Sequence, residues 1–154
     1  MILIIGSNSF AGSSFVNFLL KNKHKVIGVS RSKELNKIYL PYKENKFYKT
    51  KFKFLKGDLN INKDLEKIID IVKKYKINYI VNFAAQGMVA ESWTNPEDWY
   101  RTNILSNSKL IKELSKIKIK KYLNFSTPEV YGNTPNLIKE NFNFNPSTPY
   151  AISR

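Results

Sequence analysis

A tyrosine and, four residues later, an arginine stand in the stretch YAISR, at Tyr150 and Arg154. A helix places residues i and i+4 on one face, so the two side chains are expected to lie together. A nearby cation lowers the pKa of a phenol, which is near ~10 without it, and can turn the phenol into a base. Tyr150 and Arg154 are therefore a candidate catalytic pair, with a polar tail as the alternative interpretation.

A threonine and a glutamate form a second candidate, in the stretch STPEVYG at Thr127 and Glu129. A threonine hydroxyl can hydrogen-bond a sugar hydroxyl or keto oxygen, and a glutamate can take a proton next to a carbonyl. The stretch follows an apolar segment typical of a strand, and ligands of open α/β sheets bind beyond the carboxyl ends of strands. Glu129 is thus a candidate base, with a solvated loop acid as the alternative.

A turn with two glycines, Gly6-Ser-Asn-Ser9-Phe-Ala-Gly12, lies between an apolar run and an amphipathic stretch. In a dinucleotide-binding turn, glycines allow the tight bend and the close approach of backbone to pyrophosphate, and the helix N-terminus supplies N–H donors. The pattern favours such a turn over an ordinary strand-to-helix connection. Ser9, between the two glycines, has a side chain where the backbone would approach the pyrophosphate, so weaker or shifted phosphate binding is expected.

The second apolar stretch ends in Ser30-Arg31-Ser32-Lys33. An acidic residue at this place would bind the ribose 2′-hydroxyl of NAD. Arg31 can instead pair bidentately with a 2′-phosphate, aided by Ser32 or Lys33. NADP is therefore the expected cofactor, with NAD as the alternative, and a merely solvated Arg31 is the competing interpretation.

Short apolar stretches alternate with amphipathic ones along the chain. Strands are predicted at 2–5, 24–30, 52–59, 77–85 and 120–127. Helices are predicted where Phe10, Phe15, Phe18 and Leu19 recur at helical spacing, at 61–76 with Asn62 as a candidate cap, at 95–117, and from Thr148 or Pro149. Residues 33–50 are expected to be irregular or a short helix, and 128–147 a loop. This order predicts an α/β, Rossmann-like, doubly wound parallel sheet covered on both faces.

The composition of the 154 residues fits one globular domain, because 42% are hydrophobic and 14% aromatic. No apolar run approaches ~20 residues, so no membrane span is expected, and the first residues lack the basic leader of a secretory signal. The absence of cysteine excludes disulfides and thiolate metal sites and favours a cytoplasmic protein; no metal site is expected. The net charge of +14 comes mostly from scattered lysines, which predicts a solvated exterior and no nucleic-acid partner.

Several stretches follow the glycine turn in a fixed order: GDL (57–59), FAAQ (83–86), SWTNPEDWYRTN (92–103), STPEVYGNT (126–134) and NPSTPYAISR (145–154). This ordered set resembles the extended short-chain dehydrogenases/reductases, the nucleotide-sugar epimerases and dehydratases. It looks most like the 4,6-dehydratases that act on GDP-mannose or dTDP-glucose. Three positions depart from the family pattern: Ser9 replaces a glycine, Pro128 replaces an acid of the dTDP-glucose enzymes, and Arg154 replaces a lysine.

The resemblance implies an NAD(P)-dependent lyase that oxidises C4 of a nucleotide-sugar, eliminates water across C5 and C6, and returns the hydride. It implies four catalytic residues: Thr127, Glu129, Tyr150 and Arg154. Asp58 and Leu59 would border the adenine, and residues 84–86 would line the dinucleotide. The full set of implied cofactor-binding residues is Gly6, Ser9, Phe10, Ala11, Gly12, Arg31, Ser32, Asp58, Leu59, Ala84, Ala85, Gln86, Asn103, Tyr150 and Arg154.

The resemblance further implies that residues 1–154 are the N-terminal, NAD(P)-binding Rossmann portion, with a sheet incomplete at its C-terminal side. The C-terminal, substrate-binding portion of the family is then absent, and the 154-residue chain is expected to bind cofactor at best, without turnover. The full-length parent is expected to be a homodimer. An epimerase or decarboxylase of the same family, and a non-catalytic NADP-binding or sensing module, are the alternatives.

Overall fold

The computed structural model describes every residue from Met1 to Arg154. Its contacts divide the chain into two compact units. The first unit comprises Met1–Ala84 and Lys109–Phe125, and the second comprises Ala85–Ser108 and Ser126–Arg154. The first unit therefore holds the predicted strands, and the second holds the segments that follow the last two of them.

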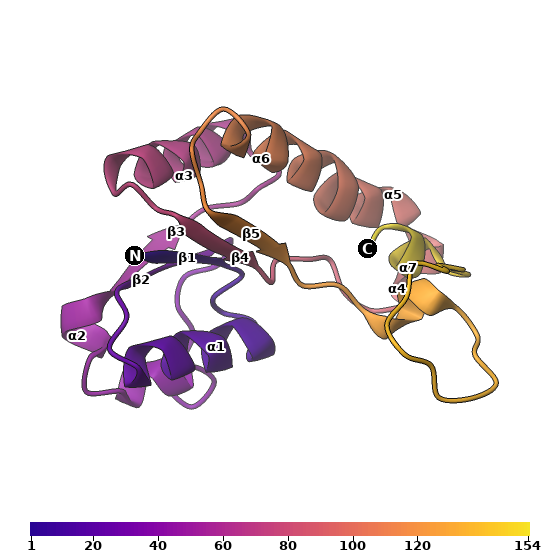
Figure 1. Ribbon diagram of the computed structural model, residues 1–154, viewed down its shortest axis with the longest axis horizontal. Helices are drawn as coiled ribbons and strands as arrows, with labels where there is room; N and C mark the ends of the chain where they lie inside the picture. The colour runs from indigo at the N-terminus through magenta and orange to yellow at the C-terminus, as the bar shows by residue number, and fades with distance from the viewer. The chain divides into compact units, whose positions relative to one another are not determined.

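A five-stranded parallel sheet forms the centre of the first unit (Figure 1). Its strands are β1 (Ile2–Ile5), β2 (Val26–Ser30), β3 (Phe52–Lys56), β4 (Tyr79–Asn82) and β5 (Lys121–Asn124). They lie in the order β3-β2-β1-β4-β5, and every pair is parallel. The chain reverses its direction of winding between β1 and β4, which is where open sheets of this kind bind ligands. The predicted doubly wound sheet is confirmed.

Helices cover both faces of this sheet (Figure 1). One face carries α1 (Phe10–Lys21), η1 (Pro41–Glu44) and α2 (Tyr48–Lys51). The other carries α3 (Asn62–Lys74) and α6 (Asn107–Leu114), the latter belonging to this unit from Lys109 onward. Each face has its own core: Leu3, Ile68 and Leu110 are fully buried on one side, and Ile4 and Val16 on the other. Burial of continuous apolar strands on both faces is the usual arrangement of parallel sheets.

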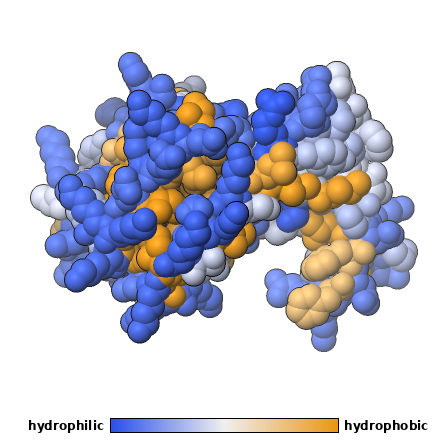
Figure 2. Space-filling model, turned by 90° about the horizontal axis from the view of Figure 1, so that it is seen from above, coloured by the Kyte–Doolittle hydropathy of each residue, from blue (hydrophilic) through white to orange (hydrophobic).

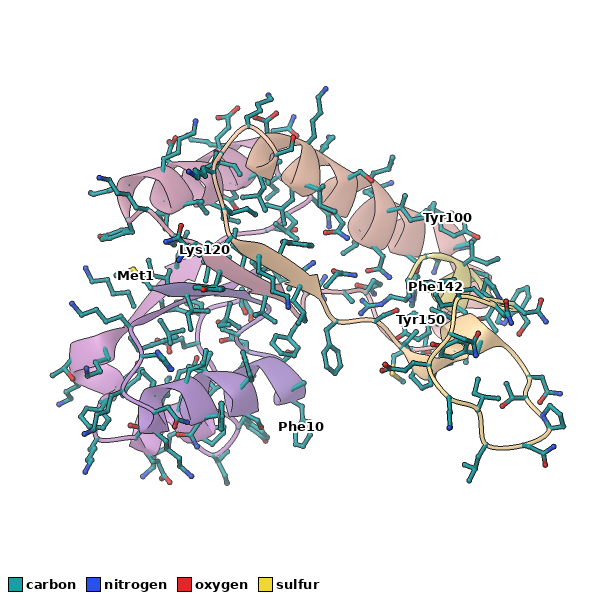
Figure 3. The ribbon with its side chains drawn as sticks, in the orientation of Figure 1. Met1, Phe10, Tyr100, Lys120, Phe142 and Tyr150 are labelled. Carbon is teal, nitrogen blue, oxygen red and sulfur yellow. The ribbon has the colours of Figure 1, made fainter.

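The helix α1 is confirmed, but the apolar spacing identified only part of its buried face. Val16, Leu19 and Leu20 are buried, whereas Phe10 is 91% exposed and Phe18 is also exposed. Phe10 projects from the beginning of the helix (Figure 3). The small residues in the first turn of α1 lie inward instead, because the backbone of the preceding turn packs closely there.

The predicted cap of α3 is wrong. Ile61 holds the N-cap position, Asn62 is the first helical residue, and no side chain caps this end. The side-chain oxygen of Asn62 accepts a hydrogen bond from Lys109 Nζ at 3.3 Å. The oxygen that was predicted to cap the helix is therefore bonded to a residue remote in sequence.

Short helices make up the second unit. They are α4 (Glu91–Thr94), α5 (Pro96–Trp99), the π-helical η2 (Tyr100–Ser106), the 3₁₀-helix η3 (Pro128–Tyr131) and α7 (Pro149–Ile152). The long helix expected at 95–117 is the succession of α5, η2 and α6, and it ends at Leu114. The predicted start of the last helix is confirmed, because the Thr148 hydroxyl accepts from Ala151 N at 3.1 Å and caps α7.

Hydrophilic side chains cover most of the face that Figure 2 shows, as the many lysines lead one to expect. None of the helices combines the length and the apolar character that crossing a membrane requires. The His, Asp and Glu side chains nowhere gather in a group of three or more that could hold a metal ion.

Candidate functional site

The glycine turn connects β1 with α1 and packs against the residues that follow β4. Gly6 has a φ of +83°, and a Cβ added to it would lie 2.6 Å from Ala84 N and 2.8 Å from the carbonyl carbon of Phe83. A Cβ on Gly12 would meet the carbonyl oxygen of Gly6. Only glycine therefore suits either position, and Ala84 borders the turn from the carboxyl end of β4.

Ser9, which replaces the middle glycine of the family pattern, is the N-cap of α1. Its hydroxyl donates to Gly6 O at 2.7 Å and accepts from Gly12 N at 3.1 Å. The side chain is thus bonded within the turn. The N–H groups of Phe10 and Ala11 belong to the first helical turn, where no preceding carbonyl can accept from them, so they can donate to an anion.

The end of β2 lies beside this turn, and a residue that the sequence analysis did not select connects them. Asn8 N donates to Ser30 Oγ at 2.9 Å, and Asn8 Nδ2 donates to Ser32 Oγ at 3.1 Å. Ser30 is buried, whereas Arg31 and Ser32 are exposed. The two residues predicted to read a 2′-phosphate therefore lie at the carboxyl edge of the sheet, next to the glycine turn.

The segment after β3 reaches the same edge, since Gly57 N donates to Ser30 O at 2.9 Å. Asp58 Oδ1 accepts a hydrogen bond from Asn60 N. Asp58 N donates to the Asp64 carboxylate. This hydrogen bond, with one from Lys67, holds the pKa of the Asp64 carboxyl below its usual value. Leu59 is buried in the core. Its side chain is therefore a packing residue, so only its backbone could border an adenine.

In the second unit, Thr127 and Glu129 are in contact. The Thr127 hydroxyl donates to Glu129 Oε2, and Glu129 lies in the first turn of η3. Pro128, between them, begins the 3₁₀-helix, and its ring offers no acid group. The structure thus brings together the hydroxyl and the carboxylate that the sequence paired, and Glu129 is exposed.

Tyr150 lies on α7, in the second unit (Figure 3). Its backbone N–H donates to Ser92 Oγ at 3.1 Å. Arg154 follows the end of this short helix, yet its guanidinium carbon lies 6.0 Å from the centre of the Tyr150 ring. This is the range of a cation–π contact, so the expected proximity of phenol and cation is confirmed.

Asn103 connects the segment after β4 with α7. Its side-chain oxygen accepts from Gln86 N at 2.8 Å, and its Nδ2 donates to Gln86 O at 3.0 Å and to Ser153 Oγ at 2.8 Å. Ser153 Oγ donates in turn to Tyr150 O at 2.7 Å. Asn103 is buried in the π-helical stretch, and such stretches often occur at functional sites; Ala85, beside Gln86, is exposed.

Three of these contacting residues, Asn8, Ser92 and Ser153, were missed by the sequence analysis. Ser92 and Ser153 stand inside stretches that carried the family resemblance, and that was the available signal. Asn8 stands between Gly6 and Ser9, two of the selected positions of the glycine turn. Each acts on a residue more than twenty positions away or on a backbone group, which no local pattern records.

The first unit has the features that a dinucleotide requires. Gly6 and Gly12 have no side chain, and a Cβ at either position would lie too close to the neighbouring backbone. The N–H groups at the start of α1 can donate hydrogen bonds to a phosphate. The polar and cationic residues after β2 lie at the same edge. A parallel α/β sheet with such a turn at its switch point defines a Rossmann-like fold, the class in which this turn commonly binds a dinucleotide.

The family follows from comparison with known proteins. Residues 3–154 match the family model described as GDP-mannose 4,6 dehydratase. The chain belongs to this family of NAD-dependent epimerases and dehydratases. The predicted resemblance is therefore confirmed.

Individual relatives include both dehydratases and epimerases. The chain is 29% identical to dTDP-D-glucose 4,6-dehydratase of Dictyostelium discoideum over 99% of its own length and 37% of that protein. It superimposes with a TM-score of 0.84 on the UDP-Glc/GlcNAc 4-epimerase of Campylobacter jejuni, at 28% identity, covering 99% of this chain and 45% of that one. A structure of MoeE5 in complex with UDP-glucose and NAD matches with a TM-score of 0.80 at 25% identity, covering 99% of this chain and 44% of that one. The chain thus spans less than half the length of these proteins.

Proposed function

We propose that the chain is the N-terminal, cofactor-binding part of an NAD(P)-dependent nucleotide-sugar 4,6-dehydratase-like enzyme. The observation that carries the proposal is the contact between Thr127 and Glu129 directly after β5, in the unit that also holds Tyr150 and Arg154. A carboxylate at this place suits elimination, which needs a base for the proton at C5. An epimerase that only oxidises and reduces C4 has no use for such a base, so Glu129 favours the dehydratase among the relatives.

The proposed steps use groups of this chain. Tyr150, with the positive charge of Arg154 beside it, takes the proton of the C4 hydroxyl, while Thr127 hydrogen-bonds the oxygen at C4. A nicotinamide dinucleotide held by the glycine turn and the start of α1 would supply the acceptor for the hydride of C4 and its later return to C6. Once C4 is a carbonyl, the C5 proton is acidic, and Glu129 removes it.

The elimination breaks the C5–H and C6–O bonds and forms the C5–C6 double bond. The departing hydroxide needs one proton to leave as water. Pro128 cannot provide it, so we assign this transfer to Glu129, which has just received the C5 proton. Addition of hydride to C6 and of a solvent proton to C5 then gives the 4-keto-6-deoxy sugar.

The test of the function is the product formed by the longer protein that contains this chain. An NDP-hexose should be converted to its 4-keto-6-deoxy form, with solvent deuterium incorporated at C5. Formation of a C4 epimer with no label at C5 would replace the dehydratase by an epimerase, and loss of carbon dioxide from an NDP-uronic acid would identify a decarboxylase. The 154-residue chain by itself is expected to bind cofactor and to form no product.

The proposed partners follow from the same reaction. The substrate is a nucleotide-sugar in the longer protein, which we expect to be a cytoplasmic homodimer. MoeE5, a structural relative, is described in complex with UDP-glucose and NAD, which supports this class of substrate. Size-exclusion chromatography with light scattering measures the oligomeric state of the longer protein.

NADP is our proposed cofactor, and Arg31→Ala tests it. The substitution should weaken NADP⁺ binding about tenfold or more, because a charged hydrogen bond to the 2′-phosphate is lost, and should leave NAD⁺ binding within about twofold. Isothermal titration calorimetry of the 154-residue chain measures both affinities. Arg101→Ala, in the second unit, is the matched control. Equal losses for the two cofactors would contradict a role for Arg31 at the 2′-phosphate.

A non-catalytic NADP-binding or sensing module is the second candidate, favoured by the departures at Ser9, Pro128 and Arg154. Arg154→Lys in the longer protein separates the two. An enzyme should gain rate, because an ammonium can both sit beside the phenol and bridge to a ribose hydroxyl, which a planar guanidinium does less well. Steady-state rates measure the gain. Absence of activity in both proteins, with NADP⁺ binding intact, would favour the sensing module.

A further inference from the structure

Asn8 uses both its backbone and its side chain on the segment after β2. Besides the bonds to Ser30 and Ser32, Asn8 Nδ2 donates to Lys33 O at 2.9 Å. A backbone carbonyl can only accept, so the nitrogen of the Asn8 amide must face the segment and the oxygen must face away. The turn after β1 is thereby bonded to residues 30–33 at several points within the first unit.

The other end of this segment is held by two phenols. Tyr42 Oη donates to Glu34 Oε1 at 3.0 Å, and Tyr48 Oη donates to Glu34 Oε2 at 3.1 Å. Tyr42 is fully buried, and this burial, with the Glu34 carboxylate beside it, raises its pKa, so it remains a protonated donor. Tyr42 Oη also lies 3.4 Å from Asn8 Oδ1. Residues 31–33 are therefore fixed between Ser30 in the sheet and Glu34 at the tyrosines.

This anchoring determines what Ser32 can offer to a ligand. Its oxygen accepts from Asn8, so its own hydroxyl hydrogen is directed elsewhere and can be donated to an anion. Arg31 and Lys33, on either side, are exposed cations of the same short segment. One hydroxyl donor and two cationic side chains, held by a fixed backbone, suit a phosphate more than a neutral hydroxyl.

We propose that Asn8 is a positioning residue that sets the preference for a phosphorylated over an unphosphorylated adenosine ribose. It does so by holding Ser32 and its neighbours at the carboxyl edge of the sheet. This inference rests on the proposed NADP specificity and adds to it a residue within the glycine turn that orders the 2′-phosphate contacts. A residue needed only for folding would change the affinity for every adenine nucleotide alike.

The experiment compares two probes that differ only in the 2′-phosphate, adenosine 2′,5′-bisphosphate and 5′-AMP. Their dissociation constants are measured by calorimetry on the 154-residue chain and on Asn8→Ala and Asn8→Asp. We expect Asn8→Ala to reduce the preference for the bisphosphate about tenfold while the affinity for 5′-AMP changes less than about twofold. Asn8→Asp keeps the size but replaces a donor by a negative charge, and should reduce the preference further. Asn17→Ala is the matched control: Asn17 lies in α1 and bonds to Asn45, and its replacement should leave the preference for the bisphosphate unchanged.

A double-mutant cycle of Ser32→Ala with the isosteric Asn8→Asp keeps the test decisive if Asn8→Ala folds poorly. Ser32 is exposed, so its replacement leaves the fold intact, and the two substitutions should be non-additive because one acts through the other. If the parent chain prefers the bisphosphate and Asn8→Ala and Asn8→Asp retain that preference, the role of Asn8 is refuted while NADP specificity stands. If the parent chain itself shows no preference, NADP specificity fails and the role of Asn8 fails with it.

Discussion

Gly6→Ala should lower the free energy of unfolding of the chain by about 3 kcal/mol and abolish dinucleotide binding. Gly6 has a φ of +83°, which costs an L-residue roughly 1–2 kcal/mol. The added Cβ would also lie 2.6 Å from Ala84 N, and neither atom belongs to a flexible side chain. The turn must therefore move away from the exit of β4, which displaces the N–H groups that begin α1. Urea unfolding followed by circular dichroism measures the stability, and NADP⁺ titration measures the binding.

Gly87→Ala is the matched control for this prediction. No atom lies within 4 Å of a Cβ built on Gly87, and its φ is not positive. Its replacement should therefore change the free energy of unfolding by less than about 0.5 kcal/mol and leave NADP⁺ affinity unchanged. A Gly6→Ala protein as stable as the Gly87→Ala protein would show that the turn relaxes without strain, contrary to the proposed role of the glycine.

The sheet could be predicted from the sequence because each strand is marked locally. Residues 2–5 and 26–30 are short apolar runs of the kind that is buried on both faces, and each is followed by a turn or a helix-forming stretch. The glycine turn was equally accessible, since Gly6, Ser9 and Gly12 are close in sequence and carry the feature within one turn. In such segments the local signal and the tertiary environment favour the same structure.

Packing partners were less accessible because they depend on the whole fold. The spacing of aromatic residues in α1 predicted that Phe10 and Phe18 lie on its inner face. Both are exposed, and the small residues Gly12 and Ser13 are buried instead, next to the glycine turn. Asn62 has a good capping side chain, yet it is bonded to Lys109, which is remote in sequence. In α1, the apolar spacing predicted the helix correctly but predicted its buried face only in part.

The polar connections between residues far apart in sequence could not be predicted. Asn103 and Ser153 are fifty residues apart and meet only in the folded chain, where the Asn103 amide also bonds to Gln86. Asn8 looks like an ordinary turn residue until the end of β2 lies beside it. A family resemblance implied the reacting groups, whereas the contacts of Asn8, Asn103 and Ser153 became visible only in the folded chain.

Glu129→Gln in the longer protein should reduce formation of the 4-keto-6-deoxy sugar by about 10³-fold, within the range that a general base contributes. The amide keeps the size of the carboxylate and can still contact the Thr127 hydroxyl, but it cannot take the C5 proton. Oxidation at C4 should persist, since we assign that step to Tyr150 and Arg154. We therefore expect substrate to produce the near-ultraviolet absorbance of reduced nicotinamide, without exchange of the C5 hydrogen for solvent deuterium.

Two further variants assign the loss to one step. Tyr150→Phe should abolish both the nicotinamide absorbance and the exchange at C5, because the C4 carbonyl that acidifies C5 is never formed. Glu140→Gln alters another exposed glutamate of the same unit and should behave as the parent protein does. Retention of C5 exchange in Glu129→Gln would mean that another group is the base, and the choice of a dehydratase over an epimerase would then lose the observation on which it rests.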